Sequence, residues 1–321
     1  MRRAWPFLAL IGVGALWGAG QPLAKTAVSE GYRHVGILFW QLALGALLLG
    51  AVTLLRGRSL RFSRGDLPLL LFVALAGTVL PGISSYTAAV HLPSGLISIL
   101  LSAVPMFTFP LALALGNDRF SWRRLAGLLL GLGAVALLVL PEASLPEPGM
   151  ARWIPVALIS SAFYALEGNV VGRWGTRGLD PVKLLAGSSA LGAMVALPLA
   201  LATGQFIDPS LPWGAPDLAI LASAAIHALA YAGYVAVVTS AGAVFAVQVS
   251  YLVTLFGLCW AMLFLGESYT GAIWGALLMM LAGMALVQPR PRGFLVSADT
   301  CAKNGSAPSK VGLAVTGDLQ A

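Results

Sequence analysis

Long apolar segments dominate the sequence, and each is about as long as an α-helix that crosses a lipid bilayer. A span takes about 20 mostly apolar residues, and about ten such segments follow one another along the 321 residues. Only 10% of the residues are charged and the mean hydropathy is +0.88, whereas a soluble domain has about 25% charged residues. The sequence therefore predicts an all-α membrane protein of about ten transmembrane helices. They are expected near residues 5–27, 35–55, 67–90, 94–115, 124–140, 154–172, 181–202, 216–239, 243–265 and 270–288.

The basic residues indicate how these helices are oriented. Most of the 19 Lys and Arg residues lie in short clusters between apolar segments, and such clusters mark cytoplasmic loops. With both termini in the cytoplasm, the opposite side keeps only Arg33 and Arg152, and Lys25 lies within a helix. The clusters lie between membrane segments and form no basic groove, so nucleic acid is not an expected partner. We expect a multi-pass protein of the plasma (inner) membrane, and a homodimer is left open.

The second half of the chain repeats the first. Short motifs that flank an apolar helix recur 149 residues later, and they pair Ser94 with Ala243, Asp118 with Glu267 and Ser121 with Thr270. Each copy holds five spans, so the second copy must be inverted relative to the first, as in many secondary transporters. The predicted organisation is a first repeat at 5–140, a Pro-rich connector at 141–153, a second repeat at 154–288 and a disordered cytoplasmic tail at 289–321.

Three groups of motifs in this order resemble the EamA-type domain of the drug/metabolite transporter superfamily. They are Leu16-Trp17-Gly18 with Lys25, then Pro93-Ser94-Gly95 leading to Pro105, and Gly266-Glu267 with Gly275 and Gly283. Two such domains cover residues from about 10 to 288. The chain departs from the family pattern at Gln41, where members often have Arg, and at Asp118, where Glu is usual. Both departures concern the choice of substrate.

The resemblance implies a secondary transporter of metabolites such as amino acids or related compounds, acting outward more than inward. Its two halves would rock about a central cavity and expose it to each side in turn. The resemblance also implies that helices one, three, four, six, eight and nine surround this cavity, with helices five and ten as buttresses.

Ionisable residues inside a membrane are costly and usually functional, which makes Glu167 the leading candidate. Glu167 shares a helix face with Ser160 and Tyr164, and it could bind a cationic group or take up a proton during exchange. It aligns near Ala19 and Gly20 of the first half and has no acidic counterpart there. The alternative for Glu167 is a hydrogen bond to a neighbouring helix or snorkelling to the inner surface.

Other helices present polar stripes that are candidates for substrate binding. Lys25 completes a stripe in the first helix and is a candidate for proton coupling, as is His227; snorkelling of Lys25 to the interface is the alternative. Gly14 and Gly18 of the same helix indicate close helix packing. The candidate binding residues are Trp17, Gln21, Ser98, Ser102, Tyr164, Glu167, His227, Tyr231, Tyr234, Gln248 and Tyr251.

Two acidic residues are expected to have structural roles, and the remaining sequence features indicate no catalytic site. Asp118 and Glu267 are expected to cap helices, where a carboxylate suits the helix dipole. The sequence has no metal-ligand spacing, no P-loop and no nucleophile with an adjacent base, so we expect no enzyme activity, cofactor or metal. A non-transporting membrane sensor or scaffold and a channel are the alternatives to a carrier.

Overall fold

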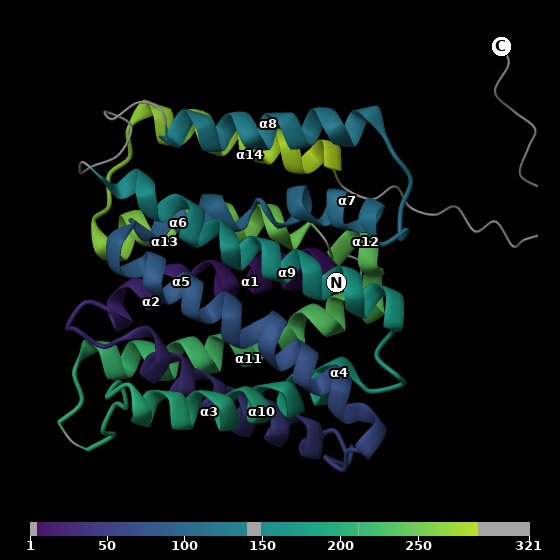
Figure 1. Cartoon of the computed structure of the whole chain (residues 1–321), viewed down its shortest axis with the longest axis vertical. Helices are drawn as coiled ribbons and strands as arrows, with labels where there is room; N and C mark the ends of the chain where they lie inside the picture. Colours follow the sequence, from purple (N-terminus) through teal and green to yellow (C-terminus); the bar gives the residue numbers. More distant parts are fainter. Residues whose placement is uncertain (1–4, 140–148, 211, 247, 288–321) are drawn as a thin grey trace, which may run out of the picture. The chain divides into compact units, whose positions relative to one another are not determined.

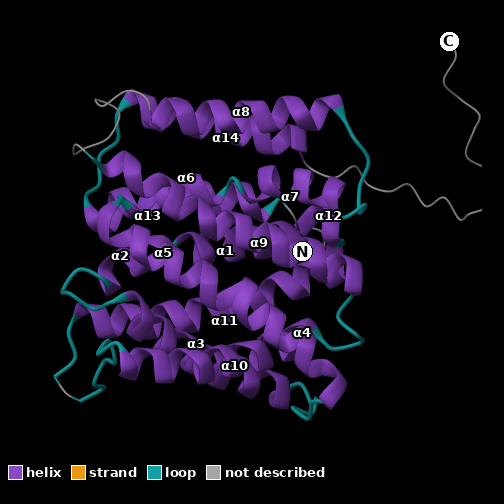
Figure 2. Ribbon diagram, viewed as in Figure 1, coloured by secondary structure: helices purple, strands orange, loops and turns teal. Residues whose placement is uncertain are grey.

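The computed structural model describes residues 5–139, 149–210, 212–246 and 248–287, and within these ranges every regular element is a helix (Figures 1 and 2). Eight helical segments are long and apolar enough to cross a membrane, and two apolar helices of 17 residues follow. Residues 141–148 of the predicted connector and the predicted tail at 289–321 lie outside the described residues, whereas Met150–Trp153 of the connector form a short 3-10 helix. The long segments are Trp5–Ala27, His34–Leu55, Arg64–His91, Ser94–Ala114, Trp122–Val139, Met150–Trp174, Pro181–Ala202 and Ala215–Ala241.

Several segments start at proline, which lacks the N–H that an early helical position would leave without a partner. Proline is one of the first two residues of α9 (Ile154–Trp174), α10 (Pro181–Ala202) and α11 (Ala215–Ala241). The unbroken spans of the first half are α3 (His34–Leu55) and α8 (Trp122–Val139). These ends lie within a few residues of those expected from hydropathy.

Three of the predicted spans are interrupted. The first consists of α1 (Trp5–Gly18) and α2 (Gly20–Ala27), and the fourth of α6 (Ser94–Leu101) and α7 (Val104–Ala114), whose second residue is a proline. The ninth consists of α12 (Ala243–Ala246) and α13 (Val249–Leu265).

The third span changes its helical type midway. Between α4 (Leu67–Phe72) and α5 (Leu80–His91) lies the π-helix η2 (Val73–Val79). A π-helical turn disturbs the regular backbone ladder and often marks a functional position.

Corresponding helices of the two halves lie side by side and run antiparallel. Gly36, near the start of α3, contacts Gln205 just beyond the end of α10, and Phe62 just beyond α3 contacts Gly187 early in α10. In the other pair, α8 packs on α14 (Gly271–Val287): Gly127 contacts Gly283, and Gly275 contacts Leu137. The second and fifth helices of each half therefore point in opposite directions, which is the relationship that inverted copies have (Figure 1).

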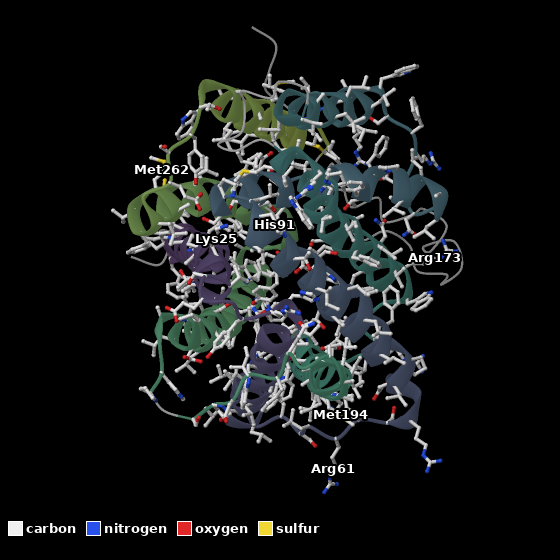
Figure 3. The ribbon with its side chains drawn as sticks, turned by 60° about the vertical axis from the view of Figure 1, so that its left-hand side comes forward. Lys25, Arg61, His91, Arg173, Met194 and Met262 are labelled. Carbon is white, nitrogen blue, oxygen red and sulfur yellow. The ribbon has the colours of Figure 1, made fainter. Side chains whose placement is uncertain are left out.

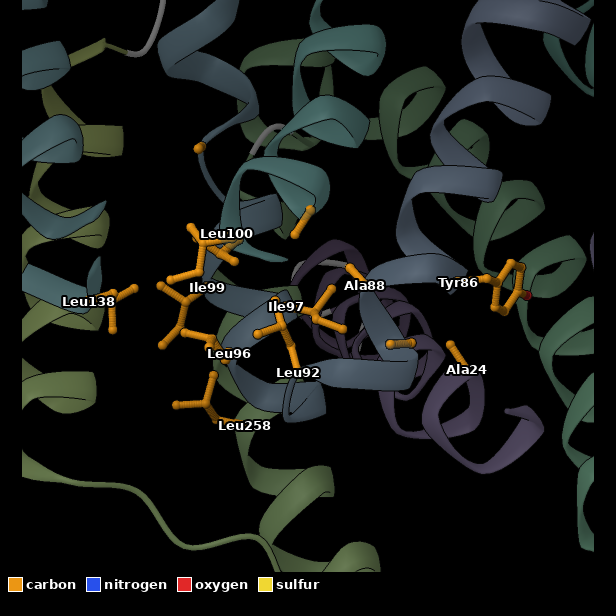
Figure 4. Close-up of a cluster of buried hydrophobic side chains, with 14 of the residues drawn as sticks. Ala24, Tyr86, Ala88, Leu92, Leu96, Ile97, Ile99, Leu100, Leu138 and Leu258 are labelled. Atoms are coloured by element: carbon orange, nitrogen blue, oxygen red, sulfur yellow. The ribbon is translucent and has the colours of Figure 1, made fainter. Parts of the chain in front are cut away.

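The core of the described region is centred on α6, every residue of which is buried except Leu101. Its side chains meet those of α5, α8 and α13, and Figure 4 shows Leu96, Ile99 and Leu100 gathered with Leu138 and Leu258. Gly14 and Gly18 of α1 lie against α13, where Gly18 faces the backbone of Gly257. The helices with more polar side chains pack around this apolar core.

The loops collect at two ends of the helices. The Glu267 end, named after that residue, also holds Lys25, Ser94 and Asp217. The Asp180 end holds Arg58, which donates to Asp180 at 2.6 Å, and the other basic residues that follow α3, α7 and α9. Figure 3 shows Lys25 near His91, and Arg61 and Arg173 on other parts of the molecule.

Candidate functional site

A cavity of about 360 Å³ lies between the two halves of the chain. Its walls come from the first, second and third spans and from their counterparts α9, α10 and α11. Most of its lining is apolar. The polar and aromatic side chains that line it are Trp17, Gln41, Thr78, Tyr164, Glu167, Thr176, Ser189, His227 and Tyr231.

Among the described residues, Glu167 is the only one with a carboxylate that lines this cavity. Within the described ranges its side chain makes no ion pair and no hydrogen bond. It lies against Gly77 of the π-helix, where an added Cβ would come within 3.0 Å of the Glu167 Cγ. Tyr164 is three residues before Glu167 on α9, and Tyr231 of α11 lines the same cavity. Glu167 is therefore a half-buried acidic group open to the cavity.

Aromatic side chains form one wall of the cavity. The ring of Trp17 lies 5.4 Å from that of Tyr234 and 6.4 Å from that of His227, measured between centroids. The spacing of four and three residues puts His227, Tyr231 and Tyr234 on one face of α11, and this face meets α1. His227 and Tyr164 remain accessible although they lie deep among the helices, because the cavity is wide enough to admit water.

A second polar group lies on α3 and was not among the predicted binding residues. The side chain of Gln41 lines the cavity, donates to Ser223 Oγ at 3.2 Å and accepts a hydrogen bond from the Tyr86 hydroxyl. A glutamine in the middle of an otherwise apolar span was the available signal. Thr78 and Ser189 also line the cavity. Their small side chains are common in membrane helices, so the sequence gave no reason to predict them as cavity residues.

Six predicted binding residues do not line this cavity: Gln21, Ser98, Ser102, Tyr234, Gln248 and Tyr251. Ser98 and Ser102 donate to carbonyls of their own helix, at 3.1 Å to Ser94 and 2.6 Å to Ile99, a common habit of hydroxyl side chains in helices. Gln21 has a buried Oε1 without a hydrogen-bond partner. Gln248 is exposed where the ninth span is interrupted, and Tyr251 follows in α13. Their role in binding stays a prediction.

Helices four and nine also differ from the expectation. No described residue of α6, α7, α12 or α13 lines the cavity, whereas α3 and α10 do. The reason is packing: α6 and α13 lie against each other, with Ser98 on Gly257, and α1 and α9 cover them.

Lys25 lies outside the cavity, at the Glu267 end. Its ammonium group donates to the carbonyl oxygens of Ala89 at 2.8 Å and Leu92 at 3.1 Å, at the end of α5. A cation there suits the negative end of the helix dipole. This position does not test whether Lys25 takes part in proton coupling, and that role stays a prediction.

The cavity reaches toward the Asp180 end, where Thr176 and Pro181 line it. At the Glu267 end, contacts between the halves close the helices together. Glu267 binds the start of α6 through Ser94, and the Tyr32 hydroxyl donates to Asp217 at 2.9 Å. The Trp40 ring N–H donates to the Ile207 carbonyl at 2.9 Å. The lining of the central cavity therefore extends toward the Asp180 end, and hydrogen bonds between the halves are found at both ends of the helices.

Comparison with known proteins places both halves in one family model. The model of the EamA-like transporter family matches residues 4–140 and again residues 151–288. The chain is 32% identical over 273 residues to the uncharacterized protein PA1977 of Pseudomonas aeruginosa, covering 84% of this chain and 90% of that protein. It also resembles a protein of known crystal structure with a TM-score of 0.59 and 18% identity, covering 87% and 96% of the two chains. This last likeness concerns the fold.

Proposed function

Because the chain belongs to the EamA-like transporter family, we propose that it exports small organic metabolites, such as amino acids or related compounds, as a secondary transporter. With its eight long apolar helices it is a multi-pass membrane protein, and the proposed location is the plasma (inner) membrane. The proposed mechanism is alternating access, in which the halves move against each other and open the cavity to each side in turn.

The cavity between the halves is the observation that carries this proposal. It is formed by three corresponding pairs of spans, and its lining continues to Thr176 and Pro181. In the proposed state this central site opens toward the Asp180 end, while the contacts between the halves at the Glu267 end close the other side. The reverse movement would release the contacts made by Glu267 and Asp217.

The proposed orientation places the Asp180 end in the cytoplasm. Among the described residues, Arg56, Arg58, Arg61, Arg64, Arg119, Arg123, Arg124, Arg173, Arg177 and Lys183 lie at that end. The Glu267 end has Lys25, Arg33 and Arg152. Cytoplasmic loops carry the excess of basic residues, so the cavity described here faces the cytoplasm and is ready to receive a substrate for export.

Glu167 is proposed to couple transport to protons. An ionised carboxylate without a partner is costly between membrane helices, so Glu167 favours binding either a proton or a cationic group of the solute. Exchange of one for the other on opposite sides would link the two fluxes.

Counterflow in proteoliposomes tests the transport function. Vesicles are preloaded with unlabelled phenylalanine or 2-phenylethylamine, and uptake of the same labelled solute is measured at several pH values. In a carrier, unlabelled solute inside the vesicles accelerates the uptake of labelled solute from outside. In a channel it has no such effect. Glu167→Gln is expected to lower flux and to remove its pH dependence, and Glu30→Gln, at an exposed loop position, is the matched control. Unchanged flux and pH dependence in Glu167→Gln would refute proton coupling through this residue.

A further inference from the structure

The charge and lining of the cavity point to a more specific class of substrate, an inference that rests on the proposed function. We propose that the cavity binds monovalent organic cations, in which a primary amine or similar cationic group is joined to an aromatic or apolar body. Among the amino acids and related compounds of the proposed function, the cavity would therefore favour amines over amino-acid zwitterions. The case depends on the charged groups around the cavity, its aromatic wall and its size.

The cavity lining carries a negative group and no basic side chain to balance it. Glu167 is the only acidic residue that lines it, and none of the lining residues is Lys or Arg. His227 is the remaining lining side chain that can carry a positive charge, and a free imidazole is mostly neutral at pH 7. An ammonium group can therefore approach Glu167, whereas the carboxylate of an amino acid would find no cation and would be repelled by Glu167.

Three basic side chains near the ends of the cavity have partners outside it. At the Asp180 end, Arg58 pairs with Asp180, and Lys183 donates to the Arg61 carbonyl at 2.7 Å and lies over the ring of Phe62. At the Glu267 end, Lys25 donates to carbonyls at the end of α5. None of these groups lines the cavity, so none is placed to receive a substrate carboxylate in this conformation.

The aromatic side chains suit both parts of such a cation. Trp17, Tyr164 and Tyr231 line the same cavity as Glu167, and aromatic faces attract ammonium groups within about 6 Å. Tyr164 and Glu167 are three residues apart on α9 and therefore share one face of that helix. The Thr78 hydroxyl, which donates to the Ala74 carbonyl, keeps lone pairs that can accept from an amine.

The volume of the cavity limits the body of the molecule. At about 360 Å³ it is at the small end of ligand pockets, which range over about 300–1,000 Å³. The mostly apolar remainder of the lining, from Leu38, Leu42, Val73, Leu184 and Leu185, leaves few polar partners for a highly hydroxylated solute. A single aromatic ring with a short amine chain fits these limits.

Equilibrium binding to the purified full-length protein tests the inference with three probes that share a phenyl ring. These are 2-phenylethylamine, a cation; phenylalanine, a zwitterion; and 3-phenylpropionate, an anion. Binding is measured by isothermal titration at neutral pH, in detergent. The amine is expected to bind at least about tenfold more tightly than either of the others, which corresponds to about 1.4 kcal/mol.

Variants of Glu167 connect the preference to this residue. Glu167→Gln is expected to weaken amine binding by about tenfold or more, and Glu167→Asp, which keeps the charge, should retain much more of it. Size-exclusion profiles and melting temperatures establish that each variant is folded. Comparable binding of phenylalanine, binding of none of the three probes, or full amine binding by folded Glu167→Gln would overturn the inference.

Binding and counterflow separate this inference from the proposed function. Preferential binding and counterflow of phenylalanine would overturn the cation preference and leave the transporter intact. Amine binding that depends on Glu167 without counterflow of any probe would support the site and contradict the transport function.

Discussion

Glu267 in the second half binds the N-terminus of the helix that begins at Ser94 in the first half. Its carboxylate accepts hydrogen bonds from the backbone N–H of Ser94 at 2.8 Å, the Ser94 hydroxyl at 2.9 Å and the N–H of Gly95 at 3.2 Å. The Tyr269 hydroxyl donates to the same carboxylate at 2.6 Å, and burial, this bond and the adjacent charge raise the pKa of Tyr269. Glu267 was expected to be a structural cap, and the helix that it caps belongs to the other half.

Glu267→Gln should therefore destabilise the protein. An amide oxygen can replace only one of the two carboxylate oxygens as acceptor, so a backbone N–H or the Tyr269 hydroxyl loses its partner, at a cost of about 1–3 kcal/mol. A thermal melt in detergent is expected to show a lower melting temperature for Glu267→Gln. The exposed Glu30→Gln serves as the control and should melt like the original protein. Equal melting of both variants would contradict the role given to Glu267.

Gly77 is expected to control the position of the Glu167 carboxylate. In Gly77→Ala the new methyl would lie 3.0 Å from the Glu167 Cγ, and overpacking of this kind costs about 1–3 kcal/mol. Binding of 2-phenylethylamine should weaken by about tenfold. Gly45→Ala is a matched control, because Gly45 lines the same cavity and has no atom within 4 Å of an added Cβ. Equal affinities of the two variants would exclude this role for Gly77.

Gly18 is predicted to be required for the close approach of α1 and α13. A Cβ at Gly18 would come within 2.9 Å of the Gly257 backbone nitrogen and 3.0 Å of the Val253 carbonyl oxygen. Backbone atoms cannot move aside as a flexible side chain can, so Gly18→Ala should cost about 1–3 kcal/mol. Gly12→Ala, on the same helix with no atom within 4 Å, should not lower stability. Denaturation of both variants side by side measures the difference.

Asp180 serves two purposes that can be separated by substitution. It accepts from the backbone N–H of Val182 and Lys183, and it pairs with Arg58. Asp180→Asn keeps a good cap and loses the charge, so the cost should stay below about 1 kcal/mol because Arg58 is exposed to solvent. Asp180→Ala also loses the cap, adding about 0.5–2 kcal/mol. If Asn proves as destabilising as Ala, the ion pair matters more than the cap.

The hydrogen bond between Tyr32 and Asp217 is predicted to lose its contribution to stability at high pH. Its hydrogen bond to Asp217, with burial and the nearby negative charges, raises the pKa of Tyr32 above its usual value of 10.0. A group whose pKa is raised in the folded state stabilises fully below its unfolded pKa, and the effect is lost as the pH rises through the folded pKa. The stability difference between the original protein and Tyr32→Phe should be constant below pH about 9 and shrink above about 10. A difference that does not change with pH would refute this.

Hydropathy and repeat spacing predicted most of the fold. The span expected at 181–202 is found as Pro181–Ala202, because a proline starts it and a polar loop follows it. The interruption at Ala19 and the π-helix at Val73–Val79 were not predicted. The hydropathy summed over about 20 residues is the same for a regular helix and for an interrupted one. Hydropathy therefore does not predict the interruption or the π-helix.

The candidate site was predicted only in part, for a related reason. Glu167, Trp17 and Tyr231 line the cavity, as their polar stripes indicated, although their role in binding awaits experiment. Ser98 lies in a stripe that turns out to be packed between helices. Gly77 is important through its lack of a side chain, which no pattern of polar residues can reveal. When nearly every helix is apolar all round, the sequence does not say which face meets a cavity.

The single carboxylate of the cavity also determines the electrical character of the proposed exchange. Glu167 has no acidic counterpart near Ala19 and Gly20 in the first half, so in the proposed exchange one monovalent cation would replace one proton in each cycle. This exchange would move no net charge across the membrane. A voltage of 100 mV is worth about 2.3 kcal/mol per charge moved, yet it would neither drive nor oppose the exchange. Only the pH difference and the concentration gradient of the cation itself would drive it.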